Sequence, residues 1–220
     1  MELLEKQKMP LWDYVILTAS NESQAQSYRM QIQYRLDHGM LPKSIHYAVL
    51  PDPDGKRVGS GGATLNVLRY IHQDAGSFDD KRILVIHSGG DSKRVPQYSA
   101  CGKLFSPVPR LLPNGRRSTL FDEFMISMCG VAARIRAGML VCSGDVLLLF
   151  NPLQIDFYGS GAAALSIKEP AEIGKNHGVY RVDEQGNVGG FLHKKTVDQL
   201  HELQAADENG NVDIDTGAVI

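Results

Sequence analysis

The chain alternates short apolar runs with longer segments of helical character, and this alternation constrains its fold most. Residues 12–18, 46–50, 83–86 and 139–143 are candidate strands, rich in aromatic and β-branched side chains. Helices are predicted between them, over residues 22–37 and 64–73 and from Ser118 up to Gly138. Strands that alternate with helices predict an α/β fold with a mostly parallel sheet and helices on both faces.

The remaining predictions concern helix faces and the last third of the chain. We expect Leu65, Leu68 and Ile71 on the buried face of the helix over residues 64–73. Residues 162–167 and 178–182 are two further candidate strands, residues 183–187 form a hairpin turn, and residues 196–206 form a helix. The chain ends in an apparent strand, so we expect residues 1–220 to be one domain that is truncated at its C-terminal end.

Composition excludes several classes of protein. A length of 220 residues fits one α/β domain, or one domain and part of another. The net charge of −2 argues against nucleic-acid binding. No apolar run approaches the roughly 20 residues that span a bilayer, so no membrane partner is expected. Three cysteines without CxxC spacing and the lack of a signal peptide predict a cytoplasmic protein with reduced thiols.

A glycine turn follows the strand over residues 83–86. Its sequence is Ser88-Gly89-Gly90-Asp91-Ser92, and Arg94 and Lys103 come after it. Such a turn frees backbone N–H groups to face an anion, and phosphate is the usual one. Arg94 can bind phosphate bidentately and Lys103 adds a mobile charge. The spacing excludes a Walker A loop and a dinucleotide fingerprint. A tight surface loop with solvated cations is the alternative.

Two further features point to the same kind of site. Gly59, Gly61, Gly62, Ala63 and Thr64 open a helix, whose free N–H groups can hold a base edge or a phosphate, although a plain loop-to-helix joint also uses glycines. Asp145 follows the strand over residues 139–143 and should emerge at the same sheet edge, where it can bind Mg²⁺ or simply form a Gly-Asp turn. Asp213 and Asp215 can supply a second metal ligand.

These motifs together resemble one family. The stretches Gly59-Ser60-Gly61-Gly62-Ala63-Thr64-Leu65, His87 to Pro96 and Ser99 to Phe105 are similar to those of GDP-fucose pyrophosphorylases, which include bifunctional fucokinase/GDP-fucose pyrophosphorylases. The resemblance runs from about Trp12 to Ile220. It implies a Rossmann-like nucleotidyltransferase domain of GT-A-like type, with a kinase domain downstream in the full-length protein.

The resemblance also implies a reaction, in which GTP and fucose 1-phosphate give GDP-fucose and pyrophosphate with Mg²⁺ as cofactor. Arg94 would hold the pyrophosphate, Lys103 the α-phosphate or the incoming one, and Asp145 with Asp215 the metal. Lys168 and Lys194 would bind the sugar phosphate. The nucleotide would contact Gly59, Gly61, Gly62, Ala63, Thr64, Ser88, Gly89, Gly90, Asp91 and Ser92. A fucokinase that uses ATP and a non-catalytic nucleotide-binding module are the alternatives.

Overall fold

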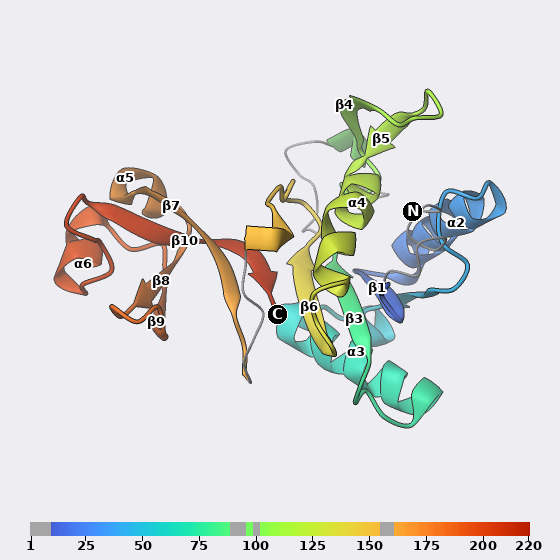
Figure 1. Cartoon of the computed structure of the whole chain (residues 1–220), viewed down its shortest axis with the longest axis horizontal. Coiled ribbons are helices and arrows are strands. Elements are labelled where there is room, and N and C mark those ends of the chain that lie inside the picture. The colour runs from blue at the N-terminus through green and yellow to red at the C-terminus, as the bar shows by residue number, and fades with distance from the viewer. Residues whose placement is uncertain (1–9, 89–95, 99–101, 155–160) are drawn as a thin grey trace. The chain divides into compact units, whose positions relative to one another are not determined.

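The computed structural model of the chain describes residues 10–88, 96–98, 102–154 and 161–220, which form two compact units (Figure 1). The first unit comprises Met1–Gly161 and Ile220, and the second comprises Ala162–Val219. The regular elements of the first unit are β1 (Tyr14–Ala19), α2 (Glu22–Asp37), β2 (His46–Pro51), η1 (Pro53–Gly55), α3 (Gly59–Ala75), β3 (Arg82–His87), η2 (Pro96–Tyr98), β4 (Pro107–Leu111), β5 (Arg117–Thr119), α4 (Leu120–Ala132), β6 (Gly138–Ser143) and η3 (Pro152–Gln154).

The first unit is built on a parallel sheet. Its strands follow the order β2-β1-β3-β6, and every neighbouring pair is parallel. In β1 the consecutive residues Val15, Ile16 and Leu17 are all fully buried. Since successive side chains of a strand point to opposite faces, both faces of the sheet are covered. The predicted α/β architecture is confirmed.

Helix α3 covers one of these faces, with a register that differs from the prediction. Ala63, Val67 and Ile71 are its buried residues, and Val67 and Ile71 pack in one cluster with Ile16 of β1. Leu65 is 68% exposed, so its predicted place on the buried face is wrong. The helix begins at Gly59 and therefore includes the glycines that the sequence placed before it. Residues at i, i+4 and i+8 from Ala63 define the face that packs on the sheet.

Helices α2 and α4 have capped N-termini. The predicted bounds of α2 are confirmed, and the Asn21 side chain accepts a hydrogen bond from the Gln24 backbone N–H (2.9 Å). Helix α4 is capped by Thr119, which forms a capping box with Asp122. The core face of α4 is formed by the buried side chains of Phe121, Phe124, Met125 and Met128.

The second unit holds an antiparallel sheet. Its elements are β7 (Ala164–Pro170), α5 (Ala171–Gly174), β8 (Gly178–Val182), β9 (Val188–His193), α6 (Val197–Glu202) and β10 (Asn211–Val219). β10 pairs with β7 and β8, and β8 pairs with β9. Val179, Leu200 and Ile214 belong to the core that α5 and α6 form on one face. The predicted hairpin turn is confirmed, because the Asp183 N–H donates to the Asn187 carbonyl (3.0 Å).

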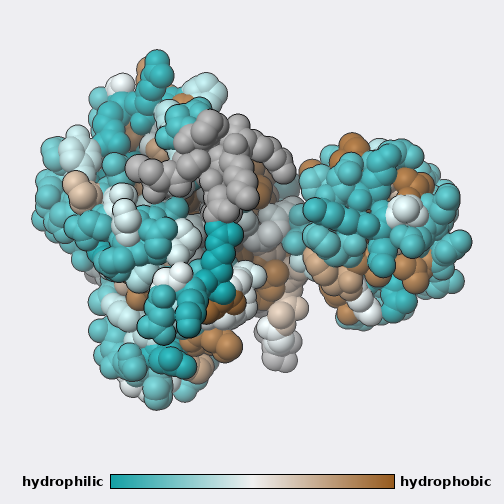
Figure 2. Space-filling model, turned by 180° about the vertical axis from the view of Figure 1, so that it is seen from behind, coloured by the Kyte–Doolittle hydropathy of each residue, from teal (hydrophilic) through white to brown (hydrophobic). Residues whose placement is uncertain are grey.

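Strands β4 and β5 are absent from the sequence prediction. They pair antiparallel as a separate two-stranded hairpin. Pro107 and Pro109 in β4 argue against a strand, since proline cannot donate to a sheet ladder. Among the described residues, no helix is long and apolar enough to cross a membrane. The face seen in Figure 2 is mainly hydrophilic, with scattered hydrophobic patches on each unit.

Candidate functional site

The carboxyl ends of three neighbouring strands meet in a small hollow, here called the carboxyl-edge recess. Thr18 comes from the end of β1, Asp52 directly follows β2, and His87 and Ser88 lie at the end of β3. The first turn of α3 completes the lining, and the cavity volume is about 180 Å³. Ligands of open α/β sheets bind at this edge. The recess is smaller than the roughly 300–1,000 Å³ of ordinary ligand pockets, so it fits a small ligand or one part of a larger one.

The start of α3 lies open toward this recess. Gly59 and Ser60 are lining residues, and Gly59 has a φ of 70°, which favours glycine. Gly62 is also required, because a Cβ there would lie 2.7 Å from the Val58 Cβ. No side chain caps the helix. The first N–H groups of α3 are therefore suited to bind a polar or anionic ligand.

His87 links the start of α3 to the ends of β1 and β3 through hydrogen bonds. The Thr64 hydroxyl donates to the Ser60 carbonyl (2.9 Å), so it accepts from His87 Nε2–H (2.9 Å). His87 Nδ1 then accepts from the Thr18 hydroxyl (3.0 Å), and that hydroxyl accepts from the Ser88 N–H (3.3 Å). Burial lowers the pKa of His87, which favours this neutral tautomer. Both ring nitrogens are engaged by protein groups, which indicates a structural role for His87.

Asp52 is the acidic group of the recess. Burial raises the pKa of its carboxyl group, while a hydrogen bond from the Val58 backbone N–H and the charge of Arg57 oppose that rise. Arg57 also lines the recess. The recess therefore presents a carboxylate, a guanidinium and the N-terminus of a helix within one small volume.

Asp145 and Lys103 meet at the next position along the same sheet edge. Ser143 of β6 is paired with His87 of β3, and the Gly144 N–H donates to the His87 carbonyl (2.7 Å). A Cβ on Gly144 would lie 2.6 Å from that carbonyl oxygen, so this approach requires glycine. Asp145 Oδ1 accepts from the Ser143 hydroxyl (2.8 Å), and Oδ2 lies 3.5 Å from Lys103 Nζ. The prediction that Asp145 emerges at this edge is confirmed.

The backbone next to Lys103 is fixed by close packing. Gly102 has a φ of 70°, and a Cβ there would lie 2.2 Å from the Tyr28 hydroxyl oxygen. Leu104 is 1% exposed, and its carbonyl accepts from the Phe121 N–H (2.7 Å). Phe105 packs against the Tyr28 ring with centroids 5.2 Å apart. Lys103 is thus held between residues that have little freedom to move.

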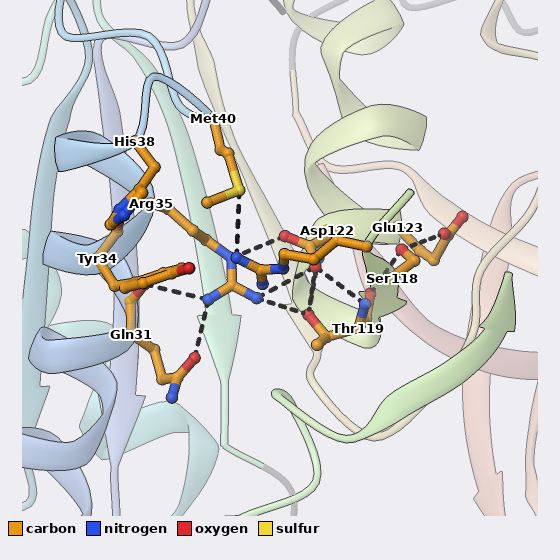
Figure 3. A network of polar contacts seen from close by, with 10 residues as sticks. Gln31, Tyr34, Arg35, His38, Met40, Ser118, Thr119, Asp122 and Glu123 are labelled. Atoms are coloured by element: carbon orange, nitrogen blue, oxygen red, sulfur yellow. Dashed lines mark hydrogen bonds and ion pairs between the residues drawn. The ribbon is translucent and has the colours of Figure 1, made fainter. Parts of the chain in front are cut away.

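A buried ion pair between Arg35 and Asp122 lies next to this packed segment; the pair is shown in Figure 3. Arg35 of α2 is fully buried and donates from Nε to Asp122 Oδ1 of α4 (2.7 Å) and from a terminal nitrogen to Oδ2 (3.1 Å). It also lies over the Phe105 ring, with its Cζ 5.0 Å from the centroid. Burial raises the pKa of Asp122, but the hydrogen bonds and charge of Arg35 outweigh it, and the net pKa is lowered. Helix α2, helix α4 and the segment after Lys103 are joined at this point.

The second unit carries a polar sheet face. Lys168 of β7 lies 3.2 Å from Asp207 and 3.5 Å from Asp213, and Asp213 accepts from the Ser166 hydroxyl (2.9 Å). Lys168, Asp213 and Ser166 border a recess of about 630 Å³. The hydrogen bond with Asp207 is the main cause that raises the pKa of Lys168. This face offers a cation and several hydrogen-bonding groups to a polar ligand.

Asp215 and Lys194 are the other predicted site residues of the second unit. Asp215 Oδ1 accepts from the Tyr180 hydroxyl (2.8 Å) and from the Gly217 N–H (2.8 Å). Burial and this bond raise the pKa of Tyr180. Lys194 follows β9, is exposed and has a φ of 49°. Asp215 and Asp145 belong to different units, so joint metal binding by the two stays a prediction.

The structure brings several predicted site residues together. Gly59, Ala63 and Ser88 line one recess, Thr64 reaches it through His87, and Lys103 faces Asp145. Gly61 and Gly62 belong to the same first turn of α3. The remaining predicted residues of the glycine turn lie outside the described part of the chain; they are Gly89, Gly90, Asp91, Ser92 and Arg94.

Sequence reasoning missed three contributors to the site. Asp52 and Arg57 are lining residues; the sequence placed Asp52 in a turn and gave no role to Arg57. The position of Asp52 directly after a strand was a usable signal, because that is where α/β proteins place ligand-binding groups. Arg35 lies in a helix that the sequence indicated to be polar, and no local pattern reveals that its guanidinium is buried.

The site can be tested for its fit to Mg²⁺. In the described part of the chain, no group of three or more His, Cys, Asp or Glu side chains gathers into a metal site. Mg²⁺ is commonly held by one or two carboxylates with waters and substrate phosphates. The Asp145 carboxylate, partly exposed and 3.5 Å from Lys103, fits that pattern.

The fold and the recess define an α/β protein with a ligand site at the carboxyl edge of a parallel sheet. The chain belongs to the fucose pyrophosphorylase family, whose model, described as the fucose pyrophosphorylase domain, matches residues 75–220. This confirms the resemblance noted from the motifs. The match is to the pyrophosphorylase, so it does not favour the fucokinase alternative.

Three curated relatives give the extent of the similarity. The chain is 31% identical to the bifunctional fucokinase/GDP-fucose pyrophosphorylase of Arabidopsis thaliana, with 96% of this chain and 23% of the relative covered. It is 32% identical to the fucose-1-phosphate guanylyltransferase of Mus musculus, with 88% of this chain and 35% of the relative covered. It is 30% identical to the Homo sapiens protein of that name, with 91% and 35% covered. The chain spans a quarter to a third of the length of these relatives.

Proposed function

We propose that this chain carries the nucleotidyl-transfer site of a fucose-1-phosphate guanylyltransferase. The reaction is GTP plus fucose 1-phosphate to GDP-fucose plus pyrophosphate. The observation that carries the proposal is that the first turn of α3 and Ser88 line one recess at the sheet edge that also carries Lys103 and Asp145, in a chain of the fucose pyrophosphorylase family.

The chemistry asks for alignment and charge neutralisation. A phosphate oxygen of fucose 1-phosphate attacks the α-phosphorus of GTP, the bond from that phosphorus to the bridging oxygen of the β-phosphate breaks, and pyrophosphate leaves with the electron pair. The sugar phosphate is already anionic at neutral pH, so no general base is required. Such transfers depend mainly on positioning and electrostatic stabilisation. This suits a site in which His87 has both ring nitrogens engaged.

Lys103 and Arg94 supply positive charge in this proposal. Lys103 Nζ lies 3.5 Å from Asp145 Oδ2, longer than an ordinary charge-assisted hydrogen bond, so the ammonium group is able to turn toward a phosphate. It would neutralise the α-phosphate or the incoming phosphate. Arg94 would hold the departing pyrophosphate through a bidentate contact.

Mg²⁺ is the proposed cofactor, with Asp145 as its ligand and Asp215 as a second ligand. When bound, the ion neutralises charge on the phosphate oxygens. Asp145 is aimed by its hydrogen bond from the Ser143 hydroxyl (2.8 Å) and by Gly144, which permits the close approach to β3. This chain's contribution is thus a carboxylate held in a fixed orientation.

The sugar phosphate is assigned to the second unit. Lys168 lies on the polar sheet face with Asp213, and Lys194 is exposed after β9. Carboxylate and hydroxyl groups on that face can accept and donate hydrogen bonds to sugar hydroxyls. The Arabidopsis thaliana relative is named as a bifunctional enzyme with fucokinase activity. We propose a downstream kinase domain for the full-length form of this protein as well.

The test measures pyrophosphate release by the full-length protein with several pairs of nucleotide and sugar 1-phosphate. GTP with fucose 1-phosphate should be the preferred pair. Asp145→Asn and Lys103→Met should each lower kcat by at least about 100-fold, because each removes charge stabilisation that acts in the transition state.

The matched controls are Asp80→Asn and Lys175→Met, which alter exposed ion pairs with Arg136 and Glu172. Both should keep normal turnover. Near-normal turnover of Asp145→Asn, with Mg²⁺ present, would contradict the assignment. GTP binding without any turnover would indicate the non-catalytic module instead.

A further inference from the structure

Asp52 is the acidic side chain among the described residues that line the carboxyl-edge recess, and its chemistry restricts what part of a nucleotide lies beside it. Asp52 stands at the carboxyl end of β2. Burial raises the pKa of its carboxyl group, whereas a backbone hydrogen bond from Val58 and the charge of Arg57 act to lower it. One acceptor site of the carboxylate is taken by the Val58 N–H. A carboxylate has about four such sites, so others remain for a ligand.

Charge decides between the two ends of a nucleotide. A triphosphate is strongly anionic, so the Asp52 carboxylate repels it, whereas Arg57 and the first N–H groups of α3 in the same recess attract it. The side of the recess formed by Asp52 therefore suits a group that donates hydrogen bonds. The N–H groups of a base are attracted by the same carboxylate. The triphosphate is better matched by Lys103, which lies toward β6 on the same sheet edge. The recess volume of about 180 Å³ also suits a single ring system better than a whole nucleotide.

The bases differ in what they offer to a carboxylate. Guanine presents two adjacent donors, N1–H and the 2-amino group, and can therefore bind both carboxylate oxygens. Adenine presents one donor, its 6-amino group, beside the acceptor N1, and uracil presents one donor between two carbonyl oxygens. Cytosine pairs one donor with an acceptor. A carboxylate can therefore pair both of its oxygens with guanine. With adenine, uracil or cytosine, one carboxylate oxygen has no donor to bind or faces an acceptor that repels it.

We propose that Asp52 is a specificity-determining residue that accepts hydrogen bonds from N1–H and the 2-amino group of guanine in the carboxyl-edge recess. This deepens the proposed function and rests on it for the nucleotide as substrate. Arg57 and the first turn of α3 complete the recess beside the base. On this proposal the first unit selects GTP over ATP, and the residues that bind fucose 1-phosphate play no part in that selection.

The experiment measures direct binding of GTP, ITP, XTP and ATP by titration calorimetry, together with pyrophosphate release, for the full-length protein. ITP lacks the 2-amino group, and XTP carries a carbonyl in its place. The unmodified protein should bind GTP roughly 10- to 100-fold more tightly than ITP, and ATP more weakly still, since a hydrogen bond to a charged group is lost.

The variant is Asp52→Asn, whose carbonyl can still accept from the Val58 N–H. Its amide donor opposes the 2-amino group of guanine but matches the carbonyl of xanthine. GTP binding should weaken by roughly 10- to 100-fold and XTP binding should strengthen. The control is Asp54→Asn in the same turn, which is exposed and should leave the order of affinities unchanged.

The outcomes separate the two proposals. If Asp52→Asn keeps the affinity order of the unmodified protein, the role of Asp52 is overturned. If base selection behaves as expected but no pyrophosphate is released with any sugar phosphate, the proposed reaction is overturned and the role of Asp52 stands. Equal affinity of the unmodified protein for GTP, ITP and ATP overturns the inference without any variant.

Discussion

His87 is half-buried at the end of β3 and lies between the hydroxyls of Thr18 and Thr64, at 3.0 and 2.9 Å. Those two contacts determine which ring nitrogen of His87 carries the hydrogen, since Thr64 already donates to Ser60 and Thr18 already accepts from Ser88. The neutral ring is the form that satisfies every donor and acceptor. Protonation would put a charge into a buried site and leave the Thr18 hydroxyl hydrogen without its acceptor.

The stability of the fold should therefore depend on the protonation of His87. Burial lowers its pKa in the folded chain, whereas the unfolded chain has an ordinary value of about 6.5. The unfolded state then binds more protons below about pH 6.5, so stability is lost as pH falls through that value. Urea unfolding between pH 5.5 and 7.5 measures the effect against His87→Gln.

The unmodified chain should be more stable than His87→Gln near neutral pH, and the difference should narrow as the pH falls. The unmodified chain and the variant share all other titratable groups, so a pH dependence of the difference in stability between them is due to His87. A difference that stays constant with pH would contradict the neutral, hydrogen-bonded histidine.

Helices α2 and α4 are joined by the ion pair of Arg35 and Asp122 (Figure 3). The Arg35 guanidinium also lies over the Phe105 ring, in the segment after Lys103. Removing one partner of a buried pair leaves an uncompensated charge. Arg35→Met should thus lower the free energy of unfolding by about 3–5 kcal/mol. The measurement is chemical denaturation followed by circular dichroism.

The exposed pair of Arg136 and Asp80 provides the control, with side chains that are 91% and 76% exposed. Arg136→Met should change stability by at most about 1 kcal/mol. A second variant, Arg35→Met with Asp122→Leu, should recover part of the loss, since it removes both charges. Equal effects of Arg35→Met and Arg136→Met would refute a stabilising role for the buried pair.

Elements with a local signal could be predicted from the sequence, and those that depend on distant partners could not. The apolar runs of β1 and β3 and the Asn21 cap of α2 carry their own patterns. The hairpin of β4 and β5 contains prolines, and the burial of Arg35 depends on Asp122, which lies 87 residues away. The glycines of α3 were placed in a loop because their low helix propensity hides a first turn.

The same distinction applies to the site. Asp145 and Ser88 were predicted at one sheet edge because parallel strands end together. Asp52 was missed because its turn sequence, Pro51-Asp52-Pro53-Asp54-Gly55, explains the residue without any ligand. Only the meeting of β2, β3 and α3 in the fold makes it part of a recess.

The whole molecule consists of two units with different kinds of sheet. The first has a parallel sheet with its recess at the carboxyl edge, and the second has an antiparallel sheet with a polar face. This division matches the two substrates of the proposed reaction, with the nucleotide assigned to the first unit and the sugar phosphate to the second. Activity should then require both units.

The most direct measurement follows the phosphorus atoms of GTP. The full-length protein is incubated with fucose 1-phosphate, Mg²⁺ and GTP labelled at either the α- or the γ-phosphorus. The proposed nucleotidyl transfer predicts that the α-label appears in GDP-fucose and the γ-label in pyrophosphate. Retention of the α-label in GDP or GTP, with the γ-label transferred to sugar or left unreacted, would contradict the account.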